Sequence, residues 1–222
     1  MKVLLTSPGV RHPSTHQALV DLLGKPIAEA SALCIPTASY GQPDGGPQSA
    51  WRFISGTQPN CPMTGLGWRS LGVLELTCLP SIDEGSWMPL VREADVLLVN
   101  GGDAAYLCYW MRRSGLADAL PSLGAVWVGF SAGSMVMTPS IGEDFVSWNP
   151  PTGGDRTLGL VDFSIFPHLD NEMLPDNCTA EAEKWAAKMP QPSYLIDDET
   201  AIKVVDGTVE VVSEGHWKLF TP

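Results

Sequence analysis

The sequence predicts a three-layer α/β fold with a mostly parallel sheet and a C-terminal β-hairpin. Short apolar runs of strand length alternate along the chain with helical patterns. Strands separated by helices in this way pair in parallel through right-handed crossovers. The run Asp95–Val99 is apolar after its first residue, as expected for a strand covered on both faces of the sheet. Near the C-terminus, two further runs flank Asp206-Gly207, a pair typical of a two-residue hairpin turn.

The first elements are a strand at Val3–Thr6 and a helix opened by Ser14. Gln17 stands where a capping box with Ser14 requires it, and Gly24 ends the helical pattern. Residues 36–67 are rich in glycine and proline, and we expect one helix between two loops there. The other predicted elements are strands at Ala32–Pro36, Leu71–Leu79, Asp95–Val99, Ala125–Gly129 and Leu160–Phe166, helices from Asp103 to Gly115, over Ser134–Thr138 and over Glu181–Met189, and the hairpin strands Ala201–Val205 and Thr208–Val212.

Composition narrows the class of protein. A length of 222 residues suits a single domain spanning residues 1–222, and 44% hydrophobic with 17% charged residues is typical of an ordered chain. The net charge of −12 repels phosphate backbones and anionic lipid, so we expect no nucleic-acid or membrane partner. The first apolar run is too short for a signal peptide and no stretch has the length of a membrane span, which predicts a cytoplasmic protein. The five scattered cysteines indicate free thiols rather than a disulfide or metal framework.

Residues 129–133, Gly-Phe-Ser-Ala-Gly, form a G-x-S-x-G motif directly after a predicted buried strand. A short apolar helix follows, so the motif has the strand, sharp turn and helix that a nucleophilic serine requires. Such a turn lifts the hydroxyl of Ser131 out of the carboxyl edge of the sheet, and the helix start presents backbone N–H groups where negative charge develops. A glycine-rich turn whose serine only caps the helix is the alternative interpretation. We favour the nucleophile because of the flanking elements.

A serine nucleophile needs a base, and the chain contains four histidines. His168 follows the predicted strand Leu160–Phe166, so it would lie at the edge of the sheet that carries Ser131. His216 is the competitor, because Asp197 or Asp198 before it would give the order Ser, Asp, His of α/β-hydrolases. The remaining two, His12 and His16, stand at the start of the first helix.

Two further segments supply candidates for the rest of the site. Gly101 and Gly102 form a second strand–turn–helix junction, and one of their N–H groups, together with that of Ala132, could hold an oxyanion. The long segment from Ser140 to Arg156 contains Glu143 and Asp144, either of which could orient the histidine. Asp162 and Asp170 are alternative carboxylates.

Taken together, three motifs resemble the dipeptidase E (aspartyl dipeptidase) family of serine peptidases, a relative of cyanophycinase. The motifs are Asn100-Gly101-Gly102-Asp103, Gly129–Ser134, and Leu158–Leu160 through Pro167-His168. The resemblance covers most of the chain. It implies a class I glutamine amidotransferase-like (flavodoxin-like) fold with serine in place of cysteine, no metal or other cofactor, and short peptides with N-terminal aspartate as substrates.

The resemblance also assigns roles by position. Ser131 matches the nucleophile and His168 the histidine, and their separation of 37 residues (168 − 131) fits the family without gaps. Gly101 or Gly102 matches the oxyanion donor. A gap-free match places the acidic member near Val146, so Glu143 or Asp144 would take that role through a local shift. The candidate for binding an aspartyl side chain is Arg156, because it lies in the loop near the site.

The sequence therefore predicts a serine peptidase for short peptides, with Ser131 as nucleophile and His168 as general base. A homodimer is among the assemblies that we consider. Two alternatives remain open at this point. One is an esterase of the α/β-hydrolase type that uses His216. The other is an inactive binding protein on an amidotransferase-like fold, in which Ser131 does no chemistry.

Overall fold

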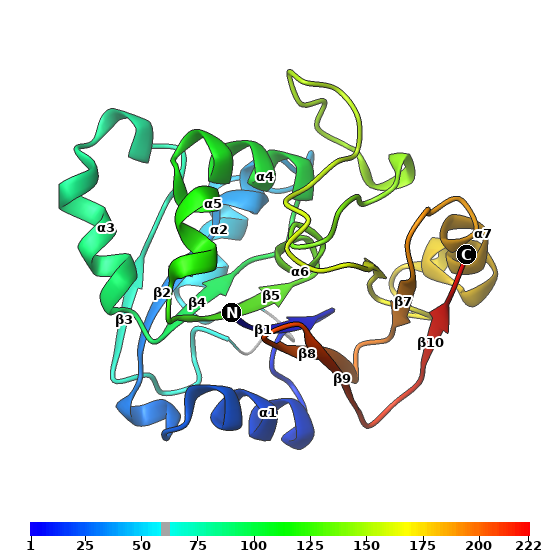
Figure 1. The fold of residues 1–222 in the computed structure, drawn as a ribbon, viewed down its shortest axis with the longest axis horizontal. Coiled ribbons are helices and arrows are strands. Elements are labelled where there is room, and N and C mark those ends of the chain that lie inside the picture. The colour runs from blue at the N-terminus through cyan, green and yellow to red at the C-terminus, as the bar shows by residue number, and fades with distance from the viewer. Residues whose placement is uncertain (59–62) are drawn as a thin grey trace.

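The computed structural model describes residues 1–58 and 63–222, and its largest feature is a twisted, mostly parallel sheet between two layers of helices (Figure 1). Within these residues seven strands pair in the order β3-β2-β4-β5-β1-β8-β9. The pairs among β1 to β5 are parallel, whereas β8 runs antiparallel to both β1 and β9. The strands are β1 (Lys2–Thr6), β2 (Ser31–Ile35), β3 (Ser70–Val73), β4 (Val96–Val99), β5 (Val126–Phe130), β8 (Thr200–Val205) and β9 (Thr208–Ser213).

A second, smaller sheet lies beside the carboxyl ends of the parallel strands (Figure 1). In the described part of the chain it consists of β6 (Ser164–Phe166), β7 (Ser193–Ile196) and β10 (Trp217–Phe220), in the order β10-β7-β6. The strands β6 and β7 are parallel, with Phe166 opposite Leu195. Its apolar face packs on Trp185 of a C-terminal helix. This sheet therefore brings a second set of strand ends close to the edge of the main sheet.

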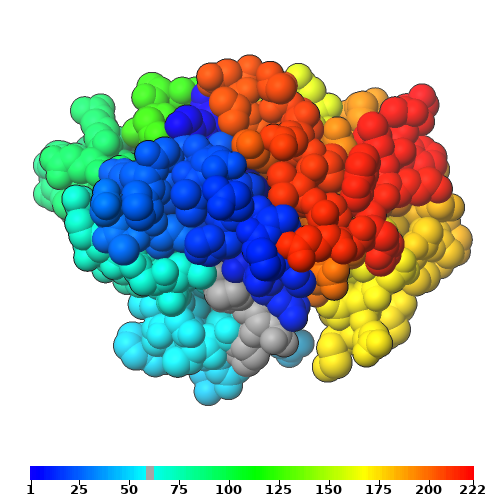
Figure 2. All heavy atoms as spheres, turned by 90° about the horizontal axis from the view of Figure 1, so that it is seen from below, coloured from blue at the N-terminus to red at the C-terminus, as the bar shows by residue number. Residues whose placement is uncertain are grey.

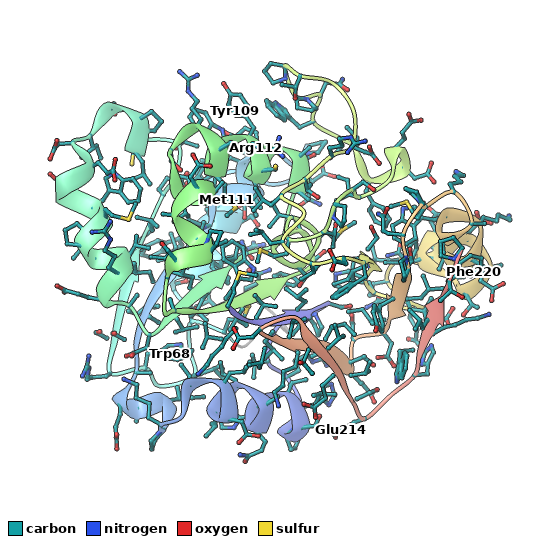
Figure 3. All side chains as sticks on the ribbon, in the orientation of Figure 1. Trp68, Tyr109, Met111, Arg112, Glu214 and Phe220 are labelled. Atoms are coloured by element: carbon teal, nitrogen blue, oxygen red, sulfur yellow. The ribbon has the colours of Figure 1, made fainter. Side chains whose placement is uncertain are left out.

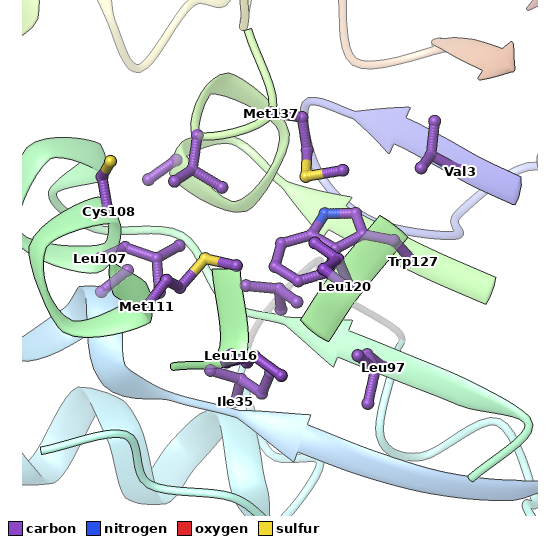
Figure 4. Close-up of a cluster of buried hydrophobic side chains, with 14 of the residues drawn as sticks. Val3, Ile35, Leu97, Leu107, Cys108, Met111, Leu116, Leu120, Trp127 and Met137 are labelled. Carbon is purple, nitrogen blue, oxygen red and sulfur yellow. The ribbon is translucent and has the colours of Figure 1, made fainter. Parts of the chain in front are cut away.

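Helices cover both faces of the main sheet, and alternate residues of its strands explain why. Leu97 and Trp127 pack on one face, whereas Val96 and Val126 pack on the other. Figure 4 shows the indole of Trp127 among Leu97, Leu120 and other side chains of the first of these clusters. Such two-sided burial is the reason for the continuously apolar strands. The helices are α1 (Pro13–Leu23), α2 (Pro47–Ile54), α3 (Glu84–Glu93), α4 (Ala104–Arg113), α5 (Leu116–Ala119), α6 (Ala132–Met135) and α7 (Thr179–Ala186).

The fold class and the C-terminal hairpin predicted from the sequence are confirmed. The strands β8 and β9 pair across the turn at Asp206-Gly207, and Asp206 has a left-handed φ of 48°. Figure 2 shows α1 next to these C-terminal strands, and the N–H of Ser14 donates to Glu214 just beyond β9 over 2.8 Å. The N- and C-terminal parts of the chain thus pack side by side, with β8 and β9 extending the main sheet beyond β1.

Several predicted boundaries were wrong. The first helix begins at Pro13 and is capped by His12 with Thr15, not by Ser14 with Gln17. The third strand ends at Val73 rather than Leu79, because the chain leaves β2 and Pro80 lies in a short 3-10 turn at Leu79–Ser81.

Four helices and strands of the described residues were not predicted at all, among them the one-turn helix α5. The helix α3 contains Pro89 in its interior, which hides its helical pattern. The strands β7 and β10 have four residues each and give only a weak periodic signal.

Two expectations from the sequence concern membrane-spanning helices and the state of the cysteines. Among the helices of the described residues, none is long and apolar enough to cross a membrane. Cys34, Cys78, Cys108 and Cys178 are free thiols, and burial raises the pKa of Cys34 to about 12. The fifth cysteine, Cys61, lies outside the described residues.

Candidate active site

Ser131 stands at a strained turn between β5 and α6. Its φ of 49° and ψ of −108° are unusual for a residue with a side chain and cost about 1–3 kcal/mol. Hydrogen bonds hold the turn: the N–H of Ser131 donates to Thr6 O over 2.9 Å, and its carbonyl accepts from the N–H groups of Ser134 and Met135. The Ser131 hydroxyl makes no capping hydrogen bond to α6. Ser131 is thus the N-cap residue of α6 through its backbone, and its hydroxyl is not used for capping.

The glycines around Ser131 are required by close backbone packing. A Cβ atom on Gly129 would collide with the carbonyl of Gly133, and one on Gly133 would lie 2.5 Å from the carbonyl of Val99. The indole N–H of Trp127 donates to Gly133 O over 2.8 Å and fixes the same turn from inside the core. The motif thus holds Ser131 rigidly, half-buried, at the carboxyl edge of the main sheet.

His168 comes from the smaller sheet, two residues after β6. Its φ of 58° is also left-handed, and its backbone N–H donates to Ser7 Oγ over 2.9 Å. Ser7 follows β1, whose last residue Thr6 binds the turn of Ser131. The segment after β1 therefore links the two loops that carry Ser131 and His168.

The partner of the His168 ring is Asp198. The Nδ1 atom lies 2.7 Å from Asp198 Oδ1, and the amide of Asn171 donates to Asp198 Oδ2 over 2.6 Å. Burial would raise the pKa of the Asp198 carboxyl. The hydrogen bond and charge of His168, the Asn171 amide and the charge of Arg11 outweigh burial and hold that pKa below its ordinary value. A carboxylate at this position fixes one ring nitrogen of His168, and the described residues give Nε2 no hydrogen-bond partner.

Ser131 and His168 line the same cavity, which has a volume of about 400 Å³. The ring of Phe130 packs edge-on against the imidazole, with 6.1 Å between the ring centroids. No hydrogen bond joins Ser131 to the imidazole among the described contacts, and such bonds often tighten only when substrate is present. The other residues that line this cavity are Gln42, Ser49, Gln58, Gly101, Gly102, Ala104, Met135, Asp144, Phe145, Ser147, Pro167, Leu174 and Asn177.

The turn at Gly101 and Gly102 forms another part of the cavity wall. Gly102 has a φ of 139°, and a Cβ atom there would collide with the carbonyl of Ala38. Asp103 follows as the cap of α4, and its carboxylate accepts from Tyr106 N over 2.7 Å. Neither Gly101 N–H nor Gly102 N–H has an acceptor among the described residues. The turn is therefore rigid and leaves donors at the cavity wall.

Comparison with known proteins identifies the family of the chain. The family model for peptidase family S51 matches residues 3–212, nearly the whole chain. The chain belongs to peptidase family S51.

Relatives of this S51 chain are moderately similar in sequence. An uncharacterized peptidase of Pasteurella multocida is 28% identical over 55% of the chain and 61% of that relative. Peptidase E of Nostoc is 31% identical over 59% of the chain and 57% of that relative. The aligned part of the S51 chain thus spans about three-fifths of the length of the curated relatives it matches.

Solved structures agree with the S51 fold. A Listeria monocytogenes protein assigned as a peptidase E superposes with a TM-score of 0.70 at 20% identity, covering 96% of this chain and 98% of that one. A peptidase from an acI-B1 Actinobacterium superposes with a TM-score of 0.64 at 19% identity, covering 99% of this chain and 93% of that one. At these identities the likeness concerns the fold.

The carboxylates expected from the loop of this S51 chain do not contact His168. Glu143 is exposed in a short turn at Glu143–Phe145, and Asp144 Oδ2 pairs with Lys188 Nζ over 2.8 Å at the rim of the cavity. Asp162 is exposed, and Asp170 binds Thr179 and His216. The expectation that Glu143 or Asp144 orients the imidazole is therefore corrected, because Asp198 occupies that position. Asp198 follows β7 as His168 follows β6, but β7 was not predicted from the sequence.

Two other predicted residues lie away from the cavity. His216 is 60% exposed and sits between Asp197 and Asp170, each 3.0 Å from a ring nitrogen. It lines a separate depression that does not include Ser131, so the esterase arrangement is not present. Arg156 is exposed and lines another cavity on the outer side of α4, so it is not positioned to bind a substrate side chain near Ser131.

Proposed function

We propose that this S51 chain is a serine peptidase that hydrolyses short peptides. The observation that carries the proposal is one cavity lined by a serine at a strained turn and by a histidine whose Nδ1 is held by a carboxylate. Ser131 Oγ attacks the peptide carbonyl while His168 Nε2 accepts its proton. His168 then gives that proton to the leaving amine. Water, activated by the same imidazole, cleaves the acyl-enzyme and restores Ser131.

Asp198 orients and supports the base in this proposal. An ionised carboxylate at Nδ1 keeps the proton on that nitrogen, leaves Nε2 free to accept, and stabilises the imidazolium that forms. The lowered pKa of Asp198 keeps it ionised across the neutral range. Asn171 is a positioning residue, because its amide holds the second carboxylate oxygen of Asp198.

The oxyanion of the tetrahedral intermediate is assigned to backbone donors. Gly101 or Gly102 supplies one N–H from the wall of the cavity, and Ala132 supplies another from the first position of α6. An N–H at the first position of a helix has no intrahelical acceptor, so it is available to a ligand. These donors are held in place before substrate binds, which is what makes them effective in stabilising developing charge.

The cavity favours uncharged side chains over an aspartyl side chain. Its volume of about 400 Å³ is within the usual range for small-ligand sites. The described residues that line it supply amides, hydroxyls, apolar groups, the His168 imidazole and the Asp144 carboxylate, but no lysine or arginine, and residues 59–62, outside the described part, carry neither in the sequence. A buried substrate carboxylate would lack a counter-charge there. We therefore propose short peptides with uncharged residues at the scissile bond as substrates.

Activity of Ser131→Ala tests the catalytic proposal. Purified protein is assayed with a panel of di- and tripeptides that differ in the side chain before the cleaved bond, and labelling by a fluorophosphonate is measured in parallel. Wild-type protein and Ser122→Ala, which changes an exposed serine remote from the cavity, should turn over peptides and take the label equally well. Ser131→Ala should do neither. Peptide turnover that persists in Ser131→Ala rules the mechanism out.

The same panel tests substrate charge. We expect kcat/KM for peptides with alanine, serine or leucine before the cleaved bond to exceed that for matched aspartyl peptides, by roughly tenfold or more. A preference for aspartate would contradict the charge argument while leaving the nucleophile intact.

A further inference from the structure

A second cavity, of about 340 Å³, lies on the outer side of α4, outside the candidate active site. Figure 3 shows Tyr109 and Arg112 on this side of α4, close to the loop that rises above the helix. The loop is the segment 140–156, whose ends pair in a bridge between Ser140 and Arg156. The lining residues are Ala105, Cys108, Tyr109, Arg112, Arg113, Pro150, Thr152 and Arg156.

Three arginines converge on this cavity, and no carboxylate from the described part of the chain lines it. Arg112 donates to Thr157 O over 2.7 Å, Arg113 reaches the Tyr109 hydroxyl only at 3.5 Å, and the guanidinium of Arg156 makes no hydrogen bond within the described residues. In the same part of the chain none of the three forms an ion pair, whereas five lysines pair with carboxylates. The guanidinium of Arg113 also lies over the Trp110 ring, 5.9 Å from its centroid. In a chain of net charge −12, this cavity is a local concentration of positive charge without carboxylate partners among the described residues.

The helix alone does not explain this arrangement. Arg112 and Arg113 occupy the last turn of α4, where cations interact favourably with the helix dipole. Arg156 belongs to a different segment, so the sequence of α4 does not account for its place at this cavity. Three exposed like charges around one cavity give it a positive potential that attracts anions, and guanidinium groups match the oxygens of carboxylates and phosphates.

The remaining residues that line the cavity indicate that the uncharged part of the ligand is apolar. Ala105, Cys108, Tyr109 and Pro150 provide an apolar wall. The Tyr109 ring is held by Trp110 and Trp148, with 5.2 and 5.3 Å between ring centroids. We propose that this cavity binds a small organic anion in which an apolar body carries a carboxylate or phosphate ester group. The oxyanion contacts the three guanidiniums, and the body packs on Tyr109.

Calorimetric titration with model anions tests the site. The probes are phenyl phosphate and benzoate, which distinguish the two oxyanion classes, with inorganic phosphate lacking the apolar body and benzyl alcohol lacking the charge. We expect at least one of the two aromatic anions to bind about tenfold more tightly than either inorganic phosphate or benzyl alcohol. Equal binding of benzyl alcohol, or no binding of either aromatic anion at millimolar concentration, would overturn the proposal.

Variants locate the bound anion. Arg156→Gln should weaken binding of the preferred probe by roughly tenfold, and Arg113→Gln with Arg156→Gln should abolish it. The matched control is Arg92→Gln, which changes an exposed arginine without an ion pair in the last turn of α3 and should bind as wild type does. Ser131→Ala should also bind normally, so the result is independent of the proposed peptidase activity. Wild-type affinity in the double variant, shown by circular dichroism to be folded, would exclude this cavity.

Discussion

The Nδ1 atom of His168 lies 2.7 Å from Oδ1 of Asp198, although 30 residues separate the two in the sequence. The pairing of β6 with β7 produces this contact, because both strands end at the same edge of the smaller sheet and each polar residue follows its strand by two positions. A histidine that is held in this way has a fixed orientation before substrate arrives, which is the main requirement for a general base.

Replacing Asp198 by asparagine should reduce kcat by roughly 10²–10⁴-fold with little change in KM. The amide keeps the size of the side chain but cannot stabilise the imidazolium, and it can hold the wrong tautomer of His168. Steady-state kinetics on the peptide that wild-type protein cleaves best provide the measurement. Glu143→Gln is the control, because Glu143 is exposed and outside the cavity and should leave kcat unchanged. Lost activity in Glu143→Gln together with normal activity in Asp198→Asn would instead assign the orientation of His168 to Glu143.

The pH dependence of stability should also change in Asp198→Asn. The folded-state pKa of Asp198 lies below the ordinary value of about 3.9, so between these values the unfolded chain binds more protons than the folded chain. The free energy of unfolding thus contains an Asp198 contribution that is complete above the unfolded pKa and is lost as pH falls through the folded pKa. The free energy of unfolding, measured by urea titration from neutral to acidic pH, should fall less in Asp198→Asn than in the wild-type protein. The same dependence of the free energy of unfolding on pH in both proteins would contradict this prediction.

The placement of Ser131 at a sharp turn between a strand and a helix was predictable from the sequence because its geometry is local. The motif at residues 129–133 encodes the strand end, the tight turn and the helix start in five consecutive residues, and close packing at Gly129 and Gly133 shows why glycine is needed. The turn at Gly101-Gly102 was predictable for the same reason. The main sheet was predictable because its strands are buried on both faces and therefore appear in the sequence as continuous apolar runs.

The acidic partner was not predictable because it depends on the pairing of two short strands. The strand β7 has four residues, follows Pro190 and Pro192, and belongs to a separate sheet, so no local pattern placed its end beside His168. Proximity along the chain favoured Glu143 and Asp144 instead. The same difficulty applies to Arg156: its loop lines the cavity of Ser131 and His168 at Ser147, but the loop folds back and carries Arg156 to the far side of α4.

Gly102→Ala should lower the free energy of unfolding by about 2–4 kcal/mol. The φ of 139° is unfavourable for alanine, and the added Cβ would collide with the backbone carbonyl of Ala38, which cannot move as a flexible side chain can. Denaturant titration measures the loss. Gly124→Ala is the matched control, because a Cβ there meets no atom within 4 Å and the backbone φ is not left-handed, so the free energy of unfolding should change little. Similar losses in both variants would contradict the close-approach argument.

The attachment of the loop 140–156 to α4 gives a last prediction, which concerns Asp103. This carboxylate is 2% exposed and accepts three hydrogen bonds: one from Tyr106 N at the start of α4, and two from Ser147 Oγ and Trp148 N in the loop, at 2.6 and 2.7 Å. Because Ser147 lines the cavity that contains Ser131, the contact positions one wall of the substrate site.

Asp103→Ala should therefore lose about 2–4 kcal/mol of stability, from the missing helix cap and from the donors of the loop that are left without an acceptor. It should also raise KM more than it lowers kcat, since the loosened wall binds substrate less well while Ser131 and His168 are held by other contacts. Ser147→Ala removes one of the three hydrogen bonds and keeps the cap, so its loss of stability should be smaller, about 1 kcal/mol. Urea titration together with steady-state kinetics measures both effects. A folded Asp103→Ala protein with wild-type KM would show that the loop does not depend on Asp103 for its position at the site.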